Sequence, residues 1–485
     1  MHRPGRVYTA AEVRQLDRTA IETHGIPGIS LMRRAGRAAF ETLRRRWPDC
    51  RAITVACGSG NNAGDGYIVA GMAVEAGIDT QLLQVGDPAR LKGDAATARD
   101  WAADVGVPRG DASLDVAGRV VVDALLGTGA TGELRPQYRA AIEAINAAGR
   151  PVLAIDLPSG ISADSGATLG AAIRADVTVT FIGEKLGLHT GEGVDHAGEV
   201  VFDALGVPAG IYDAVSGIPV VSPPPPSERP RSGHKNQFGH VLVIGGERGM
   251  GGATLLAGEA ALRTGCGLVS ILTRPEHRAP ILARMPELMV RGVSEGDDIS
   301  DLLEACTVVA VGPGLGRQPW GEQLLDEALS TGKPAVIDAD GLNLIASRDL
   351  RAPALSILTP HPGEAARLLG GAPVSDRPAA ARDLSARFGN VVVLKGAGTL
   401  VAERGEVAGI CTAGNPGLAT AGSGDVLTGI IAGLLAQGRD IRTAAEAGVS
   451  LHAAAGDLAA DRRAPQPIVA SDIVRHLWLG VERHR

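Results

Sequence analysis

The sequence has few cysteines, few aromatic residues and no excess of positive charge, and each shortage excludes a class of protein. Its five cysteines are widely spaced and form no Cys-x-x-Cys pair, which argues against a disulfide framework or a zinc site. Five Phe, four Trp, four Tyr and a formal net charge of −7 offer a nucleic acid little stacking or attraction. No apolar run approaches the roughly 18 residues of a membrane span, and residues 1–18 lack the apolar core of a signal peptide. We therefore expect a cytoplasmic protein that binds neither nucleic acid nor membrane.

What the chain does contain is enough apolar sequence for several buried cores. Forty-five per cent of its 485 residues are hydrophobic, and this length predicts two to four domains. The strongest break in composition lies at residues 214–236, where four consecutive prolines (223–226) favour extended, semi-rigid backbone. We predict a first domain at residues 1–213, a proline-rich linker at 214–235 and a second domain within 222–485.

Both halves alternate short β-branched runs with longer segments rich in Ala, Leu and Arg, a pattern typical of βα units and parallel sheets. In the first half, two helices (10–24 and 30–47) should precede strands at residues 51–57, 80–85, 119–125, 151–156 and 177–182. In the second half, strands are expected at residues 240–245, 267–273, 307–312, 334–339, 355–359 and 390–395. The sequence therefore predicts two α/β domains.

In the first half, polar and glycine-rich segments follow three of the predicted strands, at residues 58–66, 123–135 and 156–160. Carboxylates at the carboxyl ends of parallel strands point toward the crevice where open sheets bind ligands. Asn62, Asp123 and Ser159 would offer hard oxygen ligands there, suited to an alkali or alkaline-earth ion. The glycine spacing is not G-x-G-x-x-G, which disfavours an ordinary dinucleotide dehydrogenase, and a glycine-rich turn that binds nothing stays an alternative.

These three segments resemble the NAD(P)H-hydrate epimerases, whose fingerprint is N-N-G-G-D-G, D-A-(I/L)-(F/L)-G-T-G and D-(I/V/L)-P-S-G. The chain departs from it at Ala63, which is harmless if its φ is negative. The resemblance implies a Rossmann-like three-layer domain with a parallel sheet that inverts the hydrated carbon of damaged nicotinamide dinucleotides. It makes Asp156 the catalytic acid/base group and assigns K⁺ to Asn62, Asp123 and Ser159. The implied substrate contacts are Asn61, Asn62, Ala63, Gly64, Asp65, Gly127, Thr128, Gly129, Ala130, Thr131, Gly132, Glu133 and Asp156.

The sharpest motif of the second half is N-P-G-L-A-T-A-G-S-G-D at residues 415–425, which runs into an apolar helical pattern ending at Gly438. Asp425 should therefore lie in the first helical turn, beside the unpaired amides of Gly422 to Gly424. Those amides suit a phosphate, and the carboxylate suits the removal of a hydroxyl proton. The alternative is an acidic residue that only complements the helix dipole.

Four further loops join this motif: G-M-G-G-A (249–253), G-P-G-L-G (312–316), T-P-H-P-G-E (359–364) and K-G-A-G-T (395–399). Together they resemble the ribokinase-like superfamily and, more closely, the ADP- or ATP-dependent NAD(P)H-hydrate dehydratases. The resemblance implies a ribokinase-like α/β domain in which Asp425, with Mg²⁺ nearby, is the catalytic base. Contacts to the hydrated dinucleotide would come from Ala253, Gly314, His361 and Asp425. Contacts to ADP would come from Lys395, Gly396, Ala397, Gly398, Thr399 and Gly424.

The hypothesis is a bifunctional repair enzyme that epimerises the R and S hydrates of NADH and NADPH and dehydrates the S hydrate with ADP. The dehydratase resemblance also implies a homo-oligomer. One alternative is a ribokinase-like kinase for a vitamin or sugar, fused to a nucleotide-sensing domain. A second is a nucleotide-sensing scaffold without activity, against which the carboxylates Asp156 and Asp425 argue, since binding alone gains little from them.

Overall fold

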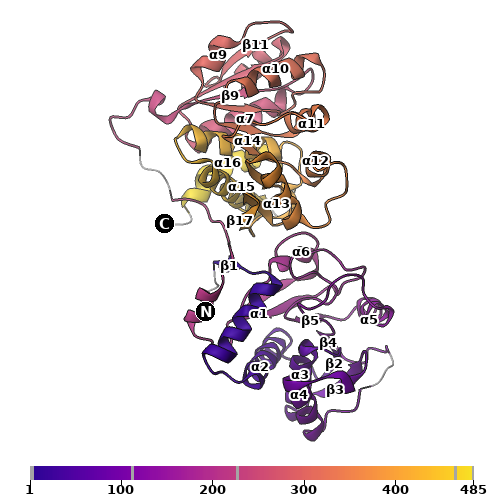
Figure 1. Ribbon diagram of the computed structural model, residues 1–485. Coiled ribbons are helices and arrows are strands. Elements are labelled where there is room, and N and C mark those ends of the chain that lie inside the picture. Colours follow the sequence, from indigo (N-terminus) through magenta and orange to yellow (C-terminus); the bar gives the residue numbers. More distant parts are fainter. Residues whose placement is uncertain (1–4, 111–113, 226–228, 464–466, 483–485) are drawn as a thin grey trace. The chain divides into compact units, whose positions relative to one another are not determined.

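The computed structural model describes residues 5–110, 114–225, 229–463 and 467–482, with side chains up to residue 477. The chain divides into two compact units, Met1–Pro219 and Val220–Arg485 (Figure 1). The division falls inside the predicted linker, of which residues 226–228, including Pro226, lie outside the described residues. The predicted domain limits themselves stay a prediction.

The first unit contains a six-stranded sheet in which every pairing is parallel, in the order β3-β2-β4-β5-β6-β7. Five of its strands confirm the sequence prediction, whereas the edge strand β7 was missed because its short apolar run is flanked by charged residues. A small antiparallel pair, β1 (Arg6–Val7) with β8 (Ile218–Pro219), ties the ends of this unit together. The sheet strands are β2 (Ala52–Cys57), β3 (Asp79–Gln84), β4 (Val120–Ala124), β5 (Val152–Ile155), β6 (Val177–Phe181) and β7 (Glu199–Asp203).

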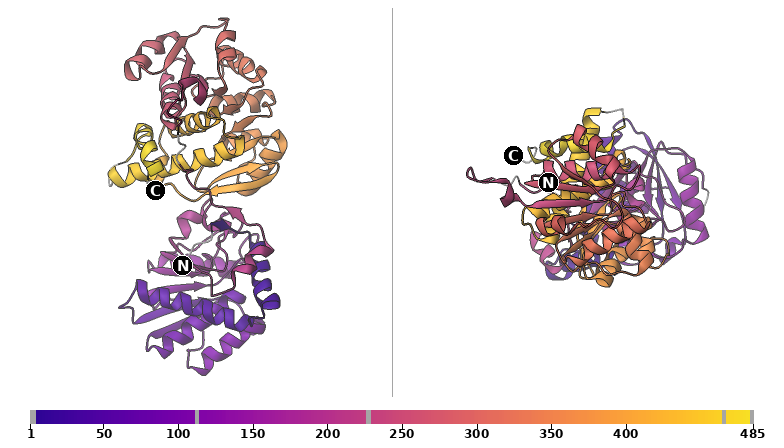
Figure 2. Two further views of the ribbon diagram at one scale, coloured as in Figure 1. Left: turned by 90° about the vertical axis from the view of Figure 1, so that its left-hand side faces the viewer. Right: turned by 90° about the horizontal axis from the view of Figure 1, so that it is seen from above.

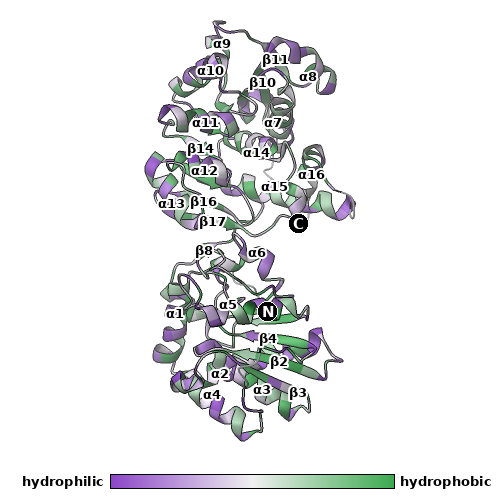
Figure 3. Cartoon of the chain, turned by 90° about the vertical axis from the view of Figure 1, so that its right-hand side faces the viewer, coloured by the Kyte–Doolittle hydropathy of each residue, from purple (hydrophilic) through white to green (hydrophobic). Residues whose placement is uncertain are grey.

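Helices cover both faces of this sheet because successive side chains of a strand point to opposite faces. Val122 of β4 packs into the core shared with the first four helices, and Val121 packs into the core shared with α5. This arrangement confirms the predicted three-layer α/β domain, and the central strands β2 and β4 are largely green, that is apolar, in Figure 3. The helices are α1 (Ala10–Arg18, continued by a π-helical turn at Thr19–Thr23), α2 (Gly28–Arg46), α3 (Asn61–Glu75), α4 (Gly93–Asp104), α5 (Pro136–Ala147) and α6 (Gly193–His196).

The second unit contains a nine-stranded sheet in the order β11-β10-β9-β12-β13-β14-β15-β16-β17. The six predicted strands are present and parallel, as expected, and β16 and β17, which were not predicted, pair antiparallel at one edge and make the sheet mixed. A turn at Arg404 and Gly405, both with positive φ, joins these two strands, as a tight hairpin requires. The strands are β9 (His240–Ile244), β10 (Leu268–Thr273), β11 (Met289–Gly292), β12 (Val308–Val311), β13 (Ala335–Ile337), β14 (Ser356–Leu358), β15 (Val391–Leu394), β16 (Thr399–Glu403) and β17 (Glu406–Cys411).

Helix α14 (Ser423–Ala436) begins within the motif at residues 415–425. It is largely buried and packs on α7 (Gly251–Thr264). A Cβ atom at Gly429 would lie 2.0 Å from the carbonyl oxygen of Ala257, so glycine is needed for this close approach. Helix α15 (Ile441–Arg463) packs against β15, β16 and β17, and Figure 2 shows the C-terminal helices from two further sides. The remaining helices are α8 (Arg278–Arg284), α9 (Ser300–Ala305), α10 (Pro319–Ser330), α11 (Ala339–Arg348), α12 (Pro362–Leu368), α13 (Arg377–Phe388) and α16 (Ala470–Glu482).

Within the described residues, none of these helices combines the length and the apolar character needed to cross a membrane.

Candidate active sites

A cavity of about 830 Å³ opens at the carboxyl edge of the first sheet, where the predicted segments converge. Ten of the predicted substrate contacts line it: Asn61, Asn62, Asp65, Gly127, Thr128, Gly129, Ala130, Thr131, Glu133 and Asp156. Ala63 and Gly64 lie instead buried in the first turn of α3, and Gly132, with a φ of 71°, lies in the exposed loop beyond β4. Ala63 is helical, so its departure from the family pattern costs no backbone strain.

The three predicted potassium ligands lie together beneath this cavity. The Asn62 amide nitrogen donates to the carbonyl oxygen of Leu126 at 3.0 Å, and the Ser159 hydroxyl lies 3.2 Å from the same oxygen. Asp123 is fully buried and accepts from the amide and the hydroxyl of Ser159 at 2.8 and 2.6 Å. Burial raises the pKa of Asp123 to about 6, although these hydrogen bonds oppose the shift.

This cluster suits a monovalent cation. The side-chain oxygen of Asn62 is buried and has no hydrogen-bond partner among the described residues, which is costly for an amide oxygen. It lies beside a buried carboxylate and carbonyl and hydroxyl oxygens, which are all hard ligands of the kind that alkali and alkaline-earth ions prefer. The residues present therefore fit the K⁺ assignment.

Asp156 adopts a φ of 69°, a left-handed conformation that is strained for a residue other than glycine. Its carboxylate forms an ion pair with Lys185, a side chain that is only 1% exposed. Asp17 of α1 and Asp65 of α3 line the same cavity. Burial raises the pKa of Asp17 to about 6 and that of Asp65 well above its usual value, with the charge of Asp156 adding to both shifts.

Two members of this cluster, Lys185 and Asp17, were missed in the sequence. Asp17 lies on the apolar side of α1, four residues after the buried Val13, where a carboxylate has no structural reason to be. Lys185 interrupts a stretch of buried residues that follows β6. A charged side chain inside an otherwise buried pattern was therefore the signal for both.

In the second unit, Asp425 lies in the first turn of α14, as predicted. Gly422 caps this helix with a φ of 85°, and a Cβ atom placed on Gly424 would lie 3.4 Å from the amine of Lys395. Burial, and then the charge of Asp338, raise the pKa of Asp425 to about 7, and Lys395 opposes the shift. The predicted base and the predicted nucleotide-binding lysine are therefore neighbours.

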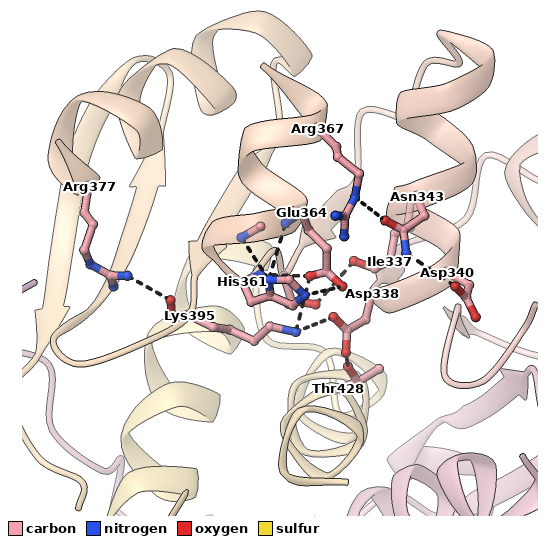
Figure 4. A network of polar contacts seen from close by, with 12 residues as sticks. Ile337, Asp338, Asp340, Asn343, His361, Glu364, Arg367, Arg377, Lys395 and Thr428 are labelled. Carbon is pink, nitrogen blue, oxygen red and sulfur yellow. Dashed lines mark hydrogen bonds and ion pairs between the residues drawn. The ribbon is translucent and has the colours of Figure 1, made fainter. Parts of the chain in front are cut away.

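Lys395 does not point into open space but lies in a network of carboxylates (Figure 4). Its amine is 2.5 Å from one oxygen of Asp338 and 3.9 Å from Glu364. The second oxygen of Asp338 accepts from the Thr428 hydroxyl at 2.9 Å. Burial raises the pKa of Glu364 to about 7. Asp338 and Thr428 were not identified in the sequence, because each follows or lies in an apolar run. Glu364 is part of the T-P-H-P-G-E motif, but the sequence assigned it no role.

His361 caps α12 rather than projecting freely. Its Nδ1 accepts from the amides of Gly363 and Glu364, at 3.0 and 3.3 Å, and Glu364 accepts in return from the His361 amide at 2.8 Å. Burial, together with the charge of Lys395, lowers the pKa of His361. The imidazole is half exposed, and its Nε2 lies 3.3 Å from the second carboxylate oxygen of Glu364, so both ring nitrogens contact the first turn of α12.

Arg377 shapes the loop that carries the other predicted nucleotide contacts. Its buried guanidinium donates to the carbonyl oxygens of Lys395, Leu394 and Gly398 at 3.0, 3.3 and 3.3 Å. Gly396 has a φ of 134°, and a Cβ atom there would lie 2.6 Å from that guanidinium. Lys395, Gly396, Ala397 and Gly398 thus form a loop, whereas Thr399, also expected in the loop, is the first residue of β16.

The remaining predicted substrate contacts, Ala253 and Gly314, lie next to each other. A Cβ atom on Gly314 would be 3.3 Å from the Cβ of Ala253, and a φ of 57° suits a glycine there. Farther along α7, Leu256 lies against Gly422 at the start of α14. Helix α7 therefore links these two residues to the end of α14 that carries Asp425.

Comparison with known proteins now identifies the class and then the family. Residues 241–477 match the family described as NAD(P)H-hydrate dehydratase, and residues 28–187 match the YjeF-related protein N-terminus. A ribokinase-like superfamily protein from Enterococcus faecalis, 32% identical with a TM-score of 0.50, covers 55% of this chain and 92% of its own. The protein is thus a two-unit α/β protein with a ribokinase-like second unit.

Relatives that match nearly the whole chain are more specific. The chain is 44% identical to the bifunctional NAD(P)H-hydrate repair enzyme Nnr of Coxiella burnetii, over 97% of this chain and 98% of that protein. It is 42% identical to the enzyme of the same name from Escherichia coli K12, over 97% and 93%. The chain belongs to the family of bifunctional NAD(P)H-hydrate repair enzymes, which confirms the resemblance and the α/β fold predicted from the sequence.

Proposed function

We propose that this chain repairs hydrated NADH and NADPH in two steps, with one site in each unit. The first unit, residues 1–213, interconverts the R and S hydrates, and the second, within residues 222–485, dehydrates the S hydrate with ADP. The observation that carries the proposal is that, in a chain of this family, each unit holds a lysine among three carboxyl groups, one of which belongs to the predicted catalytic residue.

At the first site, the start of α3 and the loop after β4 would hold the dinucleotide in the 830 Å³ cavity. The first amides of α3 have no partner within the helix, so they suit a pyrophosphate. Inverting the hydrated carbon requires one proton to be removed and another returned, and Asp156 is placed in the cavity for that transfer. K⁺ held by Asn62, Asp123 and Ser159 would supply a positive charge that balances the buried Asp123.

At the second site, Asp425 would remove the proton from the hydrate hydroxyl, and that oxygen would take the terminal phosphoryl group of ADP, releasing AMP. Elimination of phosphate, with loss of a ring proton, restores the double bond and yields NADH or NADPH. The oxygen leaves as phosphate rather than as hydroxide, which is the gain from the transfer. The Gly422 to Gly424 amides and Lys395 would stabilise phosphate charge, while Ala253, Gly314 and His361 would contact the dinucleotide.

The donor set of this site fits Mg²⁺ that is bound mainly through the nucleotide. No three His, Cys, Asp or Glu side chains in the described parts of the chain are placed to chelate a metal. Mg²⁺ usually keeps several waters and binds through substrate phosphates, so the phosphates of ADP would supply most of its ligands here.

The proposal also covers the cellular location, the oligomeric state and the ligands of the protein. All five cysteines are buried and unpaired, which is typical of a reducing compartment and supports a cytoplasmic location. We further propose a homo-oligomer, with hydrated dinucleotides and ADP rather than nucleic acid as ligands, in keeping with the formal charge of −7.

The test uses the purified R hydrate with the full-length chain. Without ADP, chromatography should show the S hydrate appearing. With ADP, the reduced cofactor, AMP and phosphate should form in equal amounts. A stable phosphorylated product would instead indicate the small-molecule kinase, and nucleotide binding without turnover of either epimer would indicate the sensing scaffold.

A further inference from the structure

Lys185 is an almost completely buried side chain of the first site, and its amine is fully engaged. It bonds to a carboxylate oxygen of Asp156, lies 3.1 Å from the Thr180 hydroxyl and donates to the carbonyl oxygen of Phe181 at 3.2 Å. An ammonium group has three protons, so these three acceptors saturate it. The lysine therefore acts on its neighbours rather than on a ligand.

Asp156 is the neighbour whose carboxylate Lys185 contacts directly. Its backbone, with a φ of 69°, is held by an amide hydrogen bond to Val179 at 2.7 Å. Its side chain lines the cavity and is 19% exposed, with the lysine bonded to one carboxylate oxygen. A strained backbone of this kind persists only where the surrounding structure imposes it. The strongest contact of the Asp156 side chain is its ion pair with Lys185.

Lys185 interacts electrostatically with three carboxyl groups, of which Asp156 is one. Asp17 from α1 and Asp65 from α3 are the other titratable groups that interact with both Asp156 and Lys185 in the described part of this unit. Both have raised pKa values, mainly because of burial. One positive charge cannot balance three carboxylates, and direct contact gives it to Asp156.

We propose that Lys185 is a positioning residue of the epimerase site, which holds Asp156 as the charged carboxylate aimed into the cavity and leaves Asp17 and Asp65 as the proton-bearing members. The proposal rests on the proposed epimerase function. The proposal makes Asp156 the proton acceptor and Asp17 and Asp65 the proton donors. An inversion needs both a group that takes a proton and a group that gives one.

The experiment compares Lys185→Met with the parent in the full chain. Removing the ammonium leaves the Asp156 carboxylate without its ion-pair partner and beside two other carboxyl groups. We expect kcat for epimerisation of the R hydrate to fall about 100-fold, the range for a lost acid/base group. The acidic limb of the pH profile should move to higher pH. Dehydration of pure S hydrate by the same molecules is the internal control and should not change.

Two further variants keep the test decisive if Lys185→Met fails to fold. Lys185→Arg retains the charge and should recover part of the lost rate and the parent's pH profile. Thr180→Val keeps the shape of the side chain but removes one acceptor of the lysine and a long hydrogen bond, 3.5 Å, to the Asp156 carboxylate. It should shift the acidic limb in the same direction as Lys185→Met by a smaller amount.

The outcomes distinguish a failure of the proposed epimerase function from a failure of the proposed role of Lys185. A parent chain that does not epimerise the R hydrate overturns the proposed function itself. A parent that does so, together with a folded Lys185→Met that shares its kcat and pH profile, overturns the role of Lys185 alone. If Lys185→Met does not fold, an unshifted profile in Thr180→Val has the same meaning.

Discussion

The two candidate sites contain the same kinds of titratable side chain, but the lysine bonds to a different carboxyl group in each. Each contains one lysine and three carboxyl groups: Lys185 with Asp17, Asp65 and Asp156 in the first unit, and Lys395 with Asp338, Glu364 and Asp425 in the second. In the first site, the lysine bonds to the predicted catalytic residue, Asp156. In the second, it bonds to Asp338, and the predicted base Asp425 has a pKa raised to about 7.

This difference shows that each lysine bonds to a different member of its carboxyl group cluster. In the first site, the lysine bonds to the predicted catalytic residue itself, whereas in the second it bonds to a neighbour of that residue. The second leaves Asp425 near the midpoint of its titration at neutral pH, where proton transfer in either direction is easiest.

The largest effect is expected from Asp425→Asn, which removes the proposed base of the second site while keeping the size of the side chain. Dehydration of the S hydrate should fall by about 10²–10⁴-fold, the contribution of a positioned acid/base group. Reduced-cofactor absorbance with S hydrate and ADP measures it. Epimerisation of the R hydrate is the control, and a parallel loss of both activities in a folded chain would contradict two separate sites.

The matching change in the first unit is Asp156→Asn. It removes the partner of Lys185 and the proposed acid/base group, so epimerisation should fall by about 10²–10³-fold. Chromatographic separation of the two hydrates after incubation without ADP measures the rate. Dehydration of pure S hydrate should keep the parent's rate, and an unchanged epimerisation rate would exclude Asp156 from the chemistry.

The third change tests the cation. Ser159→Ala removes a hydroxyl from the cluster that contains Asn62 and Asp123, and the K⁺ concentration needed for half-maximal epimerisation should rise about tenfold, as for lost ligand-shell contacts. Replacing K⁺ by a large organic cation should slow the parent as well. Equal rates with and without K⁺ would contradict the assignment, and S-hydrate dehydration under the same conditions controls for general effects of salt.

The fourth is a pH dependence. Because the pKa of Asp425 is raised to about 7, a growing share of the free enzyme carries a protonated base below that pH. The kcat/KM for dehydration should then fall about tenfold per pH unit well below pH 7, as for any single essential base. Initial rates between pH 5 and 8 with S hydrate measure it. A constant kcat/KM down to pH 5 would contradict the role of Asp425.

The smallest effect concerns stability. The pKa of Glu364 is raised to about 7, so the folded state binds its proton more tightly than the unfolded state. The stability that this proton contributes is complete below the ordinary glutamate pKa and is lost as the pH rises through about 7. Glu364→Gln should therefore raise Tm by about 2–4 °C at pH 8 and by much less at pH 4.5, measured by thermal unfolding. A lowered Tm at pH 8 would show that the carboxylate is stabilising there.

Much of the fold and of the site could be predicted because local sequence reports them directly. Buried parallel strands are continuous apolar runs, and the glycine-rich segments at 58–66 and 422–424 mark the starts of α3 and α14. The hairpin of β16 and β17 was missed because its strands pair only locally at a sheet edge and lack the long buried run of central strands.

The lysine partners could not be predicted from the sequence, and the reason is tertiary. Lys185 lies 29 residues from Asp156, and Lys395 lies 57 residues from Asp338. No spacing rule joins such pairs, because the ends of different strands bring them together: β5 and β6 are neighbours in the first sheet, and β13 and β15 lie on either side of β14 in the second. Arg377 is similar, since its helix contacts the loop after β15 only through the packing of α13 on that edge of the sheet.

The most direct test of two sites acting in succession on one damaged coenzyme uses a mixture of both hydrate epimers with the full-length chain, ADP, Mg²⁺ and K⁺. The absorbance of the reduced cofactor is followed to its end point. Complete conversion is the expected result, because the first site replenishes the S hydrate that the second consumes. Conversion that stops when the S hydrate is exhausted, with the R hydrate left unchanged, would contradict the account.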